Sequence, residues 1–227
     1  MAAKQKKLVL SAAAHQHDNP TKCPGKCGEN VHCKAYMDIV ERRMKELGVL
    51  VLRPYPDLVG TDAMNKRVAE ANKWGADLYY VAHTNAGGGR YTMTLCWDDE
   101  ASKKRAAVIG KYRKSIKDHK VKARPDLYEI RATKMPCLYD ELFFHGNAED
   151  CKWFHNGGME IMAEETVQAL CELLDVKYVA PVKETTTGKL YRVQVGAYSK
   201  KENAEATVKK LKAAGFDAII VEGGSAK

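Results

Sequence analysis

Three residues that could bind a transition metal lie where predicted structural elements begin or end. His15 comes five residues after a short apolar run at residues 8–10, and His83 closes a largely apolar run at residues 77–82. Glu29 stands just before an amphipathic helical pattern. Two imidazoles and one carboxylate fill three positions of a tetrahedral zinc ion and leave the fourth open for water, as catalysis requires. These residue types therefore indicate a hydrolytic zinc centre.

The elements expected around these residues would place them at one edge of a sheet. Residues 8–10 and 77–82 are predicted to be buried strands. A helix is predicted from about His32 to Leu47, and Gly48 follows it where helices commonly end. In an open α/β sheet, ligands gather beyond the carboxyl ends of the strands. The predicted fold class is α/β, with an open, twisted, mostly parallel sheet flanked by helices.

Several short sequence motifs between Leu8 and about Val176 point to the same family. They are the turn Gly28-Glu29, Arg67 followed by Ala71-Asn72, the run Gly75-Ala76-Asp77-Leu78, His83-Thr84-Asn85-Ala86, and Glu141-Leu142-Phe143-Phe144-His145-Gly146-Asn147 with Asp150 beyond. In these motifs the chain resembles the zinc-dependent N-acetylmuramoyl-L-alanine amidases. This family has an open sheet and includes bacterial cell-separation amidases and many phage endolysins.

The resemblance implies that His15, Glu29 and His83 hold zinc and that Glu141 is the catalytic carboxylate. Zinc would polarise the amide between N-acetylmuramic acid and the first alanine of the peptidoglycan stem peptide, and would acidify its bound water. Glu141 would take a proton from that water. The alternative for Glu141 is a solvated carboxylate at a strand edge, although its neighbours are largely apolar.

Two further residues of these motifs are candidates for binding substrate. Asn85 and Arg67 would orient the substrate or brace the loop that carries His83. A surface or capping role is the alternative for both.

The segment before His15 departs from the family pattern. The usual Asp-Pro-Gly is replaced by the longer Ser11-Ala12-Ala13-Ala14, and His17 is a second candidate for the first zinc ligand. A noncatalytic, basic protein that binds the wall or nucleic acid on a degenerate amidase fold is therefore the alternative function.

Seven cysteines give an odd count, which leaves at least one thiol unpaired and agrees with synthesis in a reducing compartment. Cys23, Cys27 and Cys33 cluster beside Glu29 and His32. They raise the alternative of a structural zinc knot, although their spacing is looser than that of the usual paired ligands.

No apolar run approaches the roughly 18 residues that a membrane span needs. The first fourteen residues imitate a secretory signal, but their apolar stretch is short, and cleavage would remove the first strand. We therefore expect an endolysin that is made in the host cytoplasm and released through a membrane pore to act on the cell wall.

The net charge of +8 favours anionic partners, either nucleic acid or wall polymers such as teichoic acids. Many of the basic residues are expected on the solvated face of one helical region: Lys103, Lys104, Arg105, Lys111, Arg113, Lys114, Lys117, Lys120 and Lys122. No nucleic-acid-binding motif accompanies them.

A second unit is expected after a polar linker. The boundaries are residues 1–178 for the catalytic domain, 179–188 for the linker and 189–227 for a small β-α-β unit. Its first strand is predicted at 190–198 by alternating apolar residues, and its second at 216–221.

The C-terminal unit contains sequence motifs that are specific to one family. They are Tyr191-Arg192-Val193-Gln194-Val195-Gly196-Ala197-Tyr198, Asn203-Ala204-Glu205-Ala206 and Leu211-Lys212-Ala213-Ala214-Gly215-Phe216. They resemble half of a SPOR peptidoglycan-binding domain. The resemblance implies that Gln194 and Tyr198 face away from the helix and bind the wall, with simple coverage of an exposed sheet face as the alternative for Tyr198. So small a unit lacks partners for its sheet edges, so we expect a homodimer through the tail, or packing of the tail on its own catalytic domain.

Overall fold

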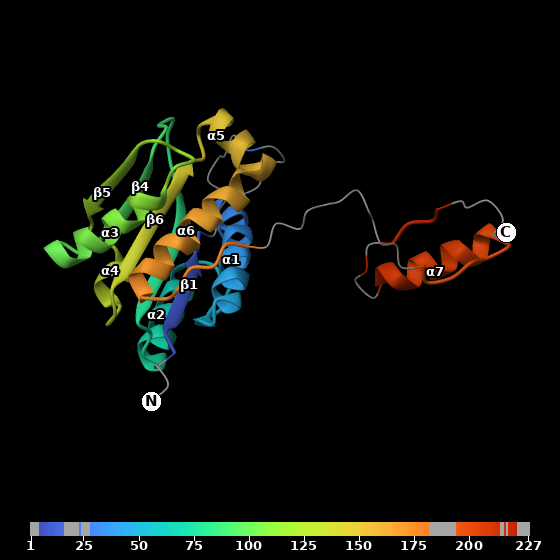
Figure 1. Ribbon diagram of the computed structural model, residues 1–227, viewed down its shortest axis with the longest axis horizontal. Coiled ribbons are helices and arrows are strands. Elements are labelled where there is room, and N and C mark those ends of the chain that lie inside the picture. Colours follow the sequence, from blue (N-terminus) through green and yellow to red (C-terminus); the bar gives the residue numbers. More distant parts are fainter. Residues whose placement is uncertain are drawn as a thin grey trace. The chain divides into compact units, whose positions relative to one another are not determined.

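The computed structural model describes residues 5–15, 23, 28–181, 194–213, 216 and 218–221. The chain forms two compact units, Met1–Pro181 and Val182–Lys227. In the first unit, helices cover both faces of one sheet (Figure 1). Its strands are β1 (Lys7–Ala12), β2 (Leu50–Leu52), β3 (Leu78–Asn85), β4 (Thr92–Cys96), β5 (His119–Ala123) and β6 (Cys137–Phe144). Its helices are α1 (Glu29–Glu46), α2 (Thr61–Trp74), α3 (Glu100–Tyr112), α4 (Tyr128–Ala132), α5 (Ala148–Trp153), the π-helical turn η1 (Phe154–Gly158) and α6 (Met159–Leu174).

The sheet has the strand order β2-β1-β3-β6-β4-β5. Strands β2, β1, β3 and β6 are parallel, β4 is antiparallel to β6, and β5 is parallel to β4. The predicted class, a mostly parallel α/β sheet flanked by helices, is confirmed. Because β2 and β3 lie on opposite sides of β1, the strand order reverses between β1 and β3, which is where open sheets of this kind bind ligands.

Alternating side chains of the central strands build one core on each face of the sheet. Leu8, Leu10 and Tyr80 are fully buried in a core that also takes residues of α1, α3 and α6. Val9 and Tyr79 point the other way, into a smaller core with residues of α2 and α4. Complete burial of each large apolar side chain contributes about 1.5–3 kcal/mol, so these two cores fix the register of the strands that carry the site.

Helix α1 follows the sequence pattern closely. Met37, Val40 and Met44 are fully buried on one face, and Gly48 has the positive φ of 82° that a side chain would disfavour. The helix begins at Glu29, one turn before the expected start near His32. Glu29 is therefore part of the helix rather than of the loop before it.

The expected basic helix is shorter than the sequence suggested. Helix α3 ends at Tyr112, and Lys120 and Lys122 are exposed on the edge strand β5. Lysines on an edge strand discourage pairing with another chain. Arg113 is not on a solvated face, because its side chain is fully buried and its Nη2 donates to Asp140 Oδ2 at 2.5 Å. The charge can be buried because this carboxylate neutralises it.

In the second unit, only the helix of the expected β-α-β pattern is present among the described residues. Helix α7 spans Lys201–Ala213, whereas residues 194–198 and 218–221 form no strand. The two expected strands are wrong for these residues, and a physical reason is that so small a sheet gains little from its hydrogen bonds.

Tyr198 also departs from its expected orientation. Its hydroxyl accepts a hydrogen bond from Thr207 Oγ1 of α7 at 2.9 Å, so the side chain is turned toward the helix. Strand alternation does not set its direction because residues 194–198 are not in a strand.

Across the described parts of both units, no helix combines the length and the apolar composition that crossing a membrane requires.

Candidate active site

The structure brings His15, Glu29 and His83 together at the carboxyl ends of β1 and β3. His15 is the third residue after β1, Glu29 is the first residue of α1, and His83 lies near the end of β3. His15 Nε2 is 3.2 Å from Glu29 Oε2, and His83 Nδ1 is 3.1 Å from Glu29 Oε1. One potential ligand atom from each residue lies within 4.8 Å of the other two.

Glu29 is the buried centre of this group, with 1 % of its surface exposed. Its Oε1 also accepts a hydrogen bond from the backbone N–H of Thr84 at 2.7 Å. Burial alone would raise the pKa of Glu29, but the hydrogen bonds and the positive charge of the histidines outweigh it and lower the pKa to about 2. Glu29 is therefore a carboxylate at neutral pH, the form that binds a metal.

His83 is held between two aromatic neighbours. Its ring stacks on Tyr139 of β6 at a centroid distance of 4.1 Å, and His15 meets it edge-on at 5.2 Å. Burial would lower the pKa of His83, but the hydrogen bond and charge of Glu29 raise it. His15 differs from its partners in having a side chain that is 49 % exposed, so the group opens to solvent on that side.

The donor set fits zinc. Two nitrogen or oxygen ligands, each bound to a tetrahedral zinc ion, lie about 3.3 Å from one another. His15 Nε2 and His83 Nδ1 lie 3.2 and 3.1 Å from different oxygens of Glu29, so each imidazole is at a suitable distance from the carboxylate oxygen that it contacts. Two imidazoles and one carboxylate are also a ligand set typical of catalytic zinc sites.

Glu141 of β6 lies directly beside His83 of β3 in the parallel register. Burial raises the pKa of Glu141 to about 7, although the positive charge of His83 opposes the rise. Its Oε2 is buried and has no hydrogen-bond partner among the described residues. A carboxyl with a buried, unpaired oxygen and a pKa near neutrality is suited to exchanging protons with a substrate or with water.

Arg67 braces a different loop from the one expected. Its Nη1 donates to the carbonyl of Ala12 at 2.6 Å, and its Nη2 donates to the carbonyl of Leu58 at 2.7 Å. These bonds hold the end of β1, which leads to His15, rather than the loop of His83. Asn85 is the last residue of β3, where its carbonyl accepts a hydrogen bond from the backbone N–H of His145 at 3.0 Å.

Of the residues weighed as alternatives, His17 and Cys27 lie outside the described residues. Cys33 is fully buried and forms no disulfide, and it does not join Cys23 in a metal-binding group. Cys23 is instead bonded to Cys151 of α5.

Sequence reasoning missed two contributors to this region. Tyr139 covers one face of His83, and its position two residues before Glu141 on the same strand could have indicated that both side chains point to the same face. His155 approaches His32 of α1, and no sequence signal pointed to it.

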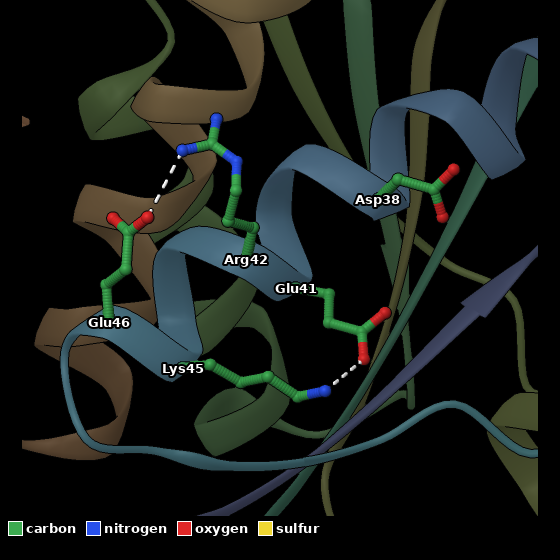
Figure 2. A pocket seen from close by; sticks show the side chains of 5 residues that line it. All are labelled: Asp38, Glu41, Arg42, Lys45 and Glu46. Carbon is green, nitrogen blue, oxygen red and sulfur yellow. Dashed lines mark hydrogen bonds and ion pairs between the residues drawn. The ribbon is translucent and has the colours of Figure 1, made fainter. Parts of the chain in front are cut away.

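Two pockets lie along α1. The first, of about 460 Å³, is lined by charged residues that pair with one another, such as Lys45 with Glu41 at 2.6 Å (Figure 2). It contains none of the candidate ligands and is a solvated helix face. The second, of about 300 Å³, is lined by Ala12, Asn30 and Arg67 among others. One of its lining residues, Asn30, directly follows the candidate ligand Glu29 in the sequence.

Residues 12–172 match the N-acetylmuramoyl-L-alanine amidase family. The chain belongs to this family. The match contains all four of the residues discussed above, His15, Glu29, His83 and Glu141, and it ends within α6, the last helix of the first unit.

Two curated relatives are amidases of bacilli. The sporulation-specific N-acetylmuramoyl-L-alanine amidase of Bacillus subtilis is 25 % identical over 170 residues, covering 70 % of this chain and 62 % of the relative. The amidase CwlM of Bacillus licheniformis is 26 % identical over 171 residues, covering 71 % of this chain and 63 % of the relative. The chain thus spans less than two thirds of the length of either relative.

Solved structures share the fold of the first unit. The catalytic domain of the amidase CwlV from Bacillus (Paenibacillus) polymyxa var. colistinus superposes with a TM-score of 0.67 and 24 % identity, covering 76 % of this chain and all of that domain. The catalytic domain of the CD27L endolysin, which targets Clostridia difficile, gives a TM-score of 0.64 and 18 % identity, covering 74 % of this chain and 98 % of that domain.

Residues 164–222 match the SPOR domain family, which confirms the SPOR resemblance of the tail. This match begins inside α6 and overlaps the end of the amidase match. Residues such as Leu170 and Leu174 of α6 are buried in the core of the amidase fold. The part of the SPOR match that is independent of that core therefore begins after α6.

Proposed function

We propose that this amidase-family chain is a zinc enzyme that hydrolyses the peptidoglycan amide between N-acetylmuramic acid and the L-alanine of the stem peptide. His15, Glu29 and His83 would hold the zinc, and Glu141 would be the catalytic carboxylate. The observation that carries the proposal is the convergence of two imidazoles and a buried carboxylate at the β1–β3 edge, beside a carboxyl with a pKa of about 7.

When bound, zinc supplies Lewis-acid chemistry, which polarises a carbonyl and acidifies water. Glu141 takes a proton from the water that attacks the amide carbonyl, and its unpaired Oε2 is the atom available for this step. As the C–N bond breaks, Glu141 passes the proton to the leaving nitrogen. The products are the lactyl carboxylate of the muramic acid and a peptide with a free N-terminal alanine.

The other residues hold this arrangement in place. Tyr139 covers one face of His83 and keeps solvent from it. Arg67 ties the end of β1 to the loop at Leu58, and so limits the positions that His15 can take. The pocket lined by Ala12, Asn30 and Arg67 is the place where we expect part of the substrate to bind, and Asn85, at the end of β3, is the other proposed substrate contact.

The role of Glu141 can be tested with Glu141→Gln and a soluble muropeptide. The glutamine amide cannot accept the proton, so turnover should fall by roughly a hundredfold to ten-thousandfold while zinc content stays at the parental level. The free alanine amine in the product is measured by mass spectrometry. The exposed carboxylate of Glu160 provides a matched control, Glu160→Gln. Turnover within about threefold of the parent would exclude Glu141 from the mechanism.

For the second unit, we propose that it binds peptidoglycan, with anionic wall polymers as additional partners of the basic chain. The SPOR match supports wall binding, and Gln194 and Tyr198 remain the proposed contact residues. Tyr198 is 45 % exposed even though its hydroxyl bonds to α7, so its ring can still stack on a sugar. Val195, Phe216 and Ile219 are more exposed still, at 63 %, 64 % and 77 %, and we propose that they pair two chains as a homodimer.

The endolysin role is a separate proposal about the biological setting. A phage endolysin would accumulate in the host cytoplasm and reach the wall through a pore made by another protein. An endolysin domain shares the fold, whereas the two curated relatives are bacterial amidases, one of them sporulation-specific. Expression in a bacterial host with and without a pore-forming partner tests the proposed route of release. The endolysin role predicts lysis only when the pore opens, and lysis without the pore would contradict it.

A further inference from the structure

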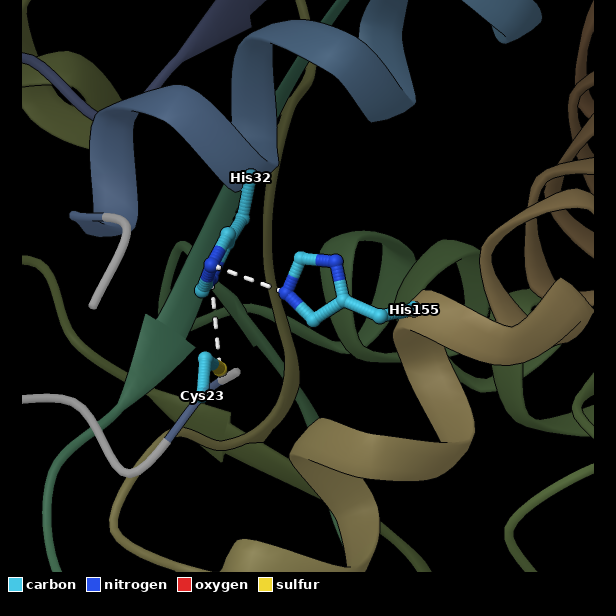
Figure 3. A group of neighbouring side chains, drawn as sticks. All are labelled: Cys23, His32 and His155. Atoms are coloured by element: carbon cyan, nitrogen blue, oxygen red, sulfur yellow. Dashed lines mark hydrogen bonds between the residues drawn. The ribbon is translucent and has the colours of Figure 1, made fainter. Parts of the chain in front are cut away.

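A second group of metal-binding side chains lies apart from the three residues of the proposed zinc site. Cys23 precedes α1, His32 lies in the first turns of α1, and His155 belongs to η1 (Figure 3). His32 Nε2 is 3.2 Å from His155 Nε2, and Cys23 Sγ is 3.9 Å from His32 Nδ1. One potential ligand atom from each of the three residues lies within 4.8 Å of the others.

A break between two helices accompanies the placement of His155. The chain leaves helical geometry directly after it, at Asn156 and at Gly157, whose φ is 92°. Glycine tolerates this positive φ, which other residues disfavour. Because of this break, the direction of His155 is set independently of α6, and its ring meets that of His32 nearly at right angles, with a centroid distance of 4.8 Å.

The distances between the ligand atoms suit a tetrahedral ion such as zinc if the sulfur of Cys23 shifts. Two imidazole nitrogens on one tetrahedral ion lie about 3.3 Å apart, and the two Nε2 atoms are 3.2 Å apart. A thiolate sulfur on the same ion would lie about 3.6 Å from each nitrogen. Cys23 Sγ, which contacts Nδ1 of His32 at 3.9 Å, would have to shift toward the Nε2 side of that ring to complete the site.

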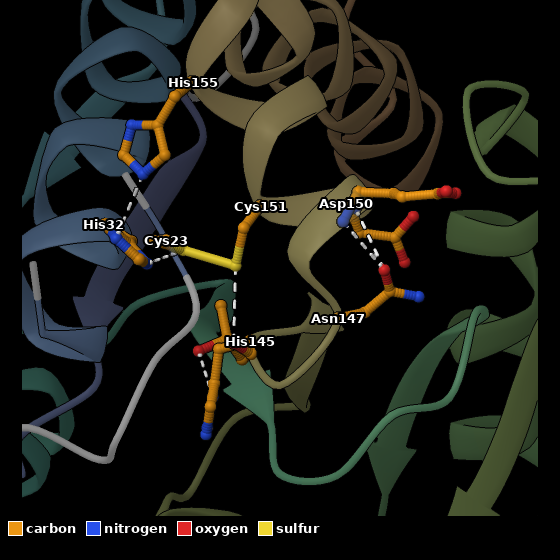
Figure 4. Close-up of a disulfide and its surroundings, with 9 residues drawn as sticks. Cys23, His32, His145, Asn147, Asp150, Cys151 and His155 are labelled. Atoms are coloured by element: carbon orange, nitrogen blue, oxygen red, sulfur yellow. Dashed lines mark hydrogen bonds between the residues drawn. A yellow bond between two sulfur atoms is a disulfide. The ribbon is translucent and has the colours of Figure 1, made fainter. Parts of the chain in front are cut away.

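Cys23 cannot make that movement while it is bonded to Cys151 (Figure 4). A disulfide sulfur is also not a thiolate, which is the form of cysteine that binds metals. If the disulfide opens, each sulfur has another group nearby. Cys23 Sγ has the two histidines, and Cys151 Sγ lies 3.3 Å from the carbonyl oxygen of His145, to which a thiol can donate.

We propose that Cys23, His32 and His155 form a second metal site, specific for zinc-like ions, that exists in the reduced chain and is closed by the Cys23–Cys151 disulfide. Opening the disulfide requires a dithiol reductant, which supplies two electrons and two protons. The sulfur–sulfur bond breaks, both cysteines become thiols, and the reductant becomes a disulfide. The incoming ion then displaces the thiol proton of Cys23.

Cys23 lies between two ligands of the proposed zinc centre in the chain, His15 and Glu29. Either the disulfide or the metal would connect Cys23 to the α5–η1 region. The chain would then have one anchor under oxidising conditions and another under reducing conditions. The inference concerns metal binding alone and does not depend on the proposed amidase activity.

Cobalt(II) can test the proposal in the full chain, because thiolate-to-cobalt charge transfer absorbs in the near ultraviolet and the His15–Glu29–His83 site has no thiolate. The protein is titrated with cobalt anaerobically, once oxidised and once after treatment with dithiothreitol that is then removed. We expect the charge-transfer band, and about one additional bound cobalt, only in the reduced chain.

Variants connect the band to the named residues. Cys151→Ser should show the band without any reductant, because Cys23 is then free. Cys23→Ser should lack it under all conditions, whereas Cys171→Ala, which removes a buried cysteine of α6 that forms no disulfide, should retain it. His155→Ala should weaken cobalt binding at least about tenfold, and it changes an exposed residue, so it tests the site even if the cysteine variants fold poorly.

Three results would overturn the proposal. They are a band of parental strength in Cys23→Ser, unchanged cobalt affinity in His155→Ala, and equal thiolate-to-cobalt absorption in the oxidised and reduced parent.

Discussion

Glu141 should destabilise the metal-free protein above neutral pH, and replacing it with glutamine should remove that cost. In the folded chain its pKa is about 7, compared with 4.5 for an ordinary glutamate. Between these values the folded state holds a proton that the unfolded state has released. Stability therefore falls as the pH rises from about 4.5 to about 7, and the whole cost is present above pH 7.

The size of this cost follows from the pKa difference. Each pH unit between the two pKa values corresponds to about 1.4 kcal/mol, which gives at most about 3 kcal/mol. The residue is partly exposed, so the measured value should be smaller. Glutamine has nearly the same shape and no charge. The free energy of unfolding of Glu141→Gln, relative to the parent, should thus be about 1–3 kcal/mol more favourable at pH 8 than at pH 5.

Urea unfolding of both proteins in the presence of a chelator, at about pH 5 and about pH 8, measures this difference. Glu160→Gln serves as the control, since an exposed carboxylate should give the same small difference at both pH values. An equal change in the stability of Glu141→Gln at the two pH values, or a loss of stability at pH 8 only, would contradict a pKa of Glu141 that is raised by burial.

The remaining predictions concern the core and the tail. Asp140 accepts hydrogen bonds from Tyr80, Thr94 and the buried Arg113, so Asp140→Asn should cost about 3–5 kcal/mol in urea unfolding by leaving the arginine charge unpaired, and a cost below about 1 kcal/mol would contradict this role. Deleting residues 182–227 should leave turnover of soluble muropeptides near the parental value, weaken sedimentation with purified walls, and convert a dimer to a monomer in light scattering. A full-length chain that is monomeric at tens of micromolar would exclude the pairing but not wall binding.

Periodicity predicted the parts of the fold that local patterns control. The strands around Val9 and Tyr80 could be recognised because both of their faces are buried, which gives continuous apolar runs. The end of α1 shortly before Gly48 could be predicted because glycine readily adopts the positive φ that terminates a helix. The sheet order was not accessible in the same way, because the pairing of β6 between β3 and β4 depends on contacts between distant segments.

The errors arose where tertiary contacts override a local pattern. Arg113 belongs to a basic stretch, and only the position of Asp140 across the core explains why it is buried. Residues 194–198 alternate as a strand does, but among the described residues they have no strand partner. For the site, the sequence motifs named side chains that the structure places together, whereas the group formed by Cys23, His32 and His155 needed the irregular geometry of η1, which no periodicity reveals.

The most direct test of the zinc proposal is to measure metal content and amidase activity together in the parent and in His83→Ala. The parent should contain about one zinc per chain in the oxidised form, and chelation should remove zinc and activity in parallel. His83→Ala should lose both, because two remaining ligands hold zinc weakly. Parental zinc content in that variant, or full activity of the parent after its zinc has been removed, would contradict the assignment of His15, Glu29 and His83 as a catalytic zinc site.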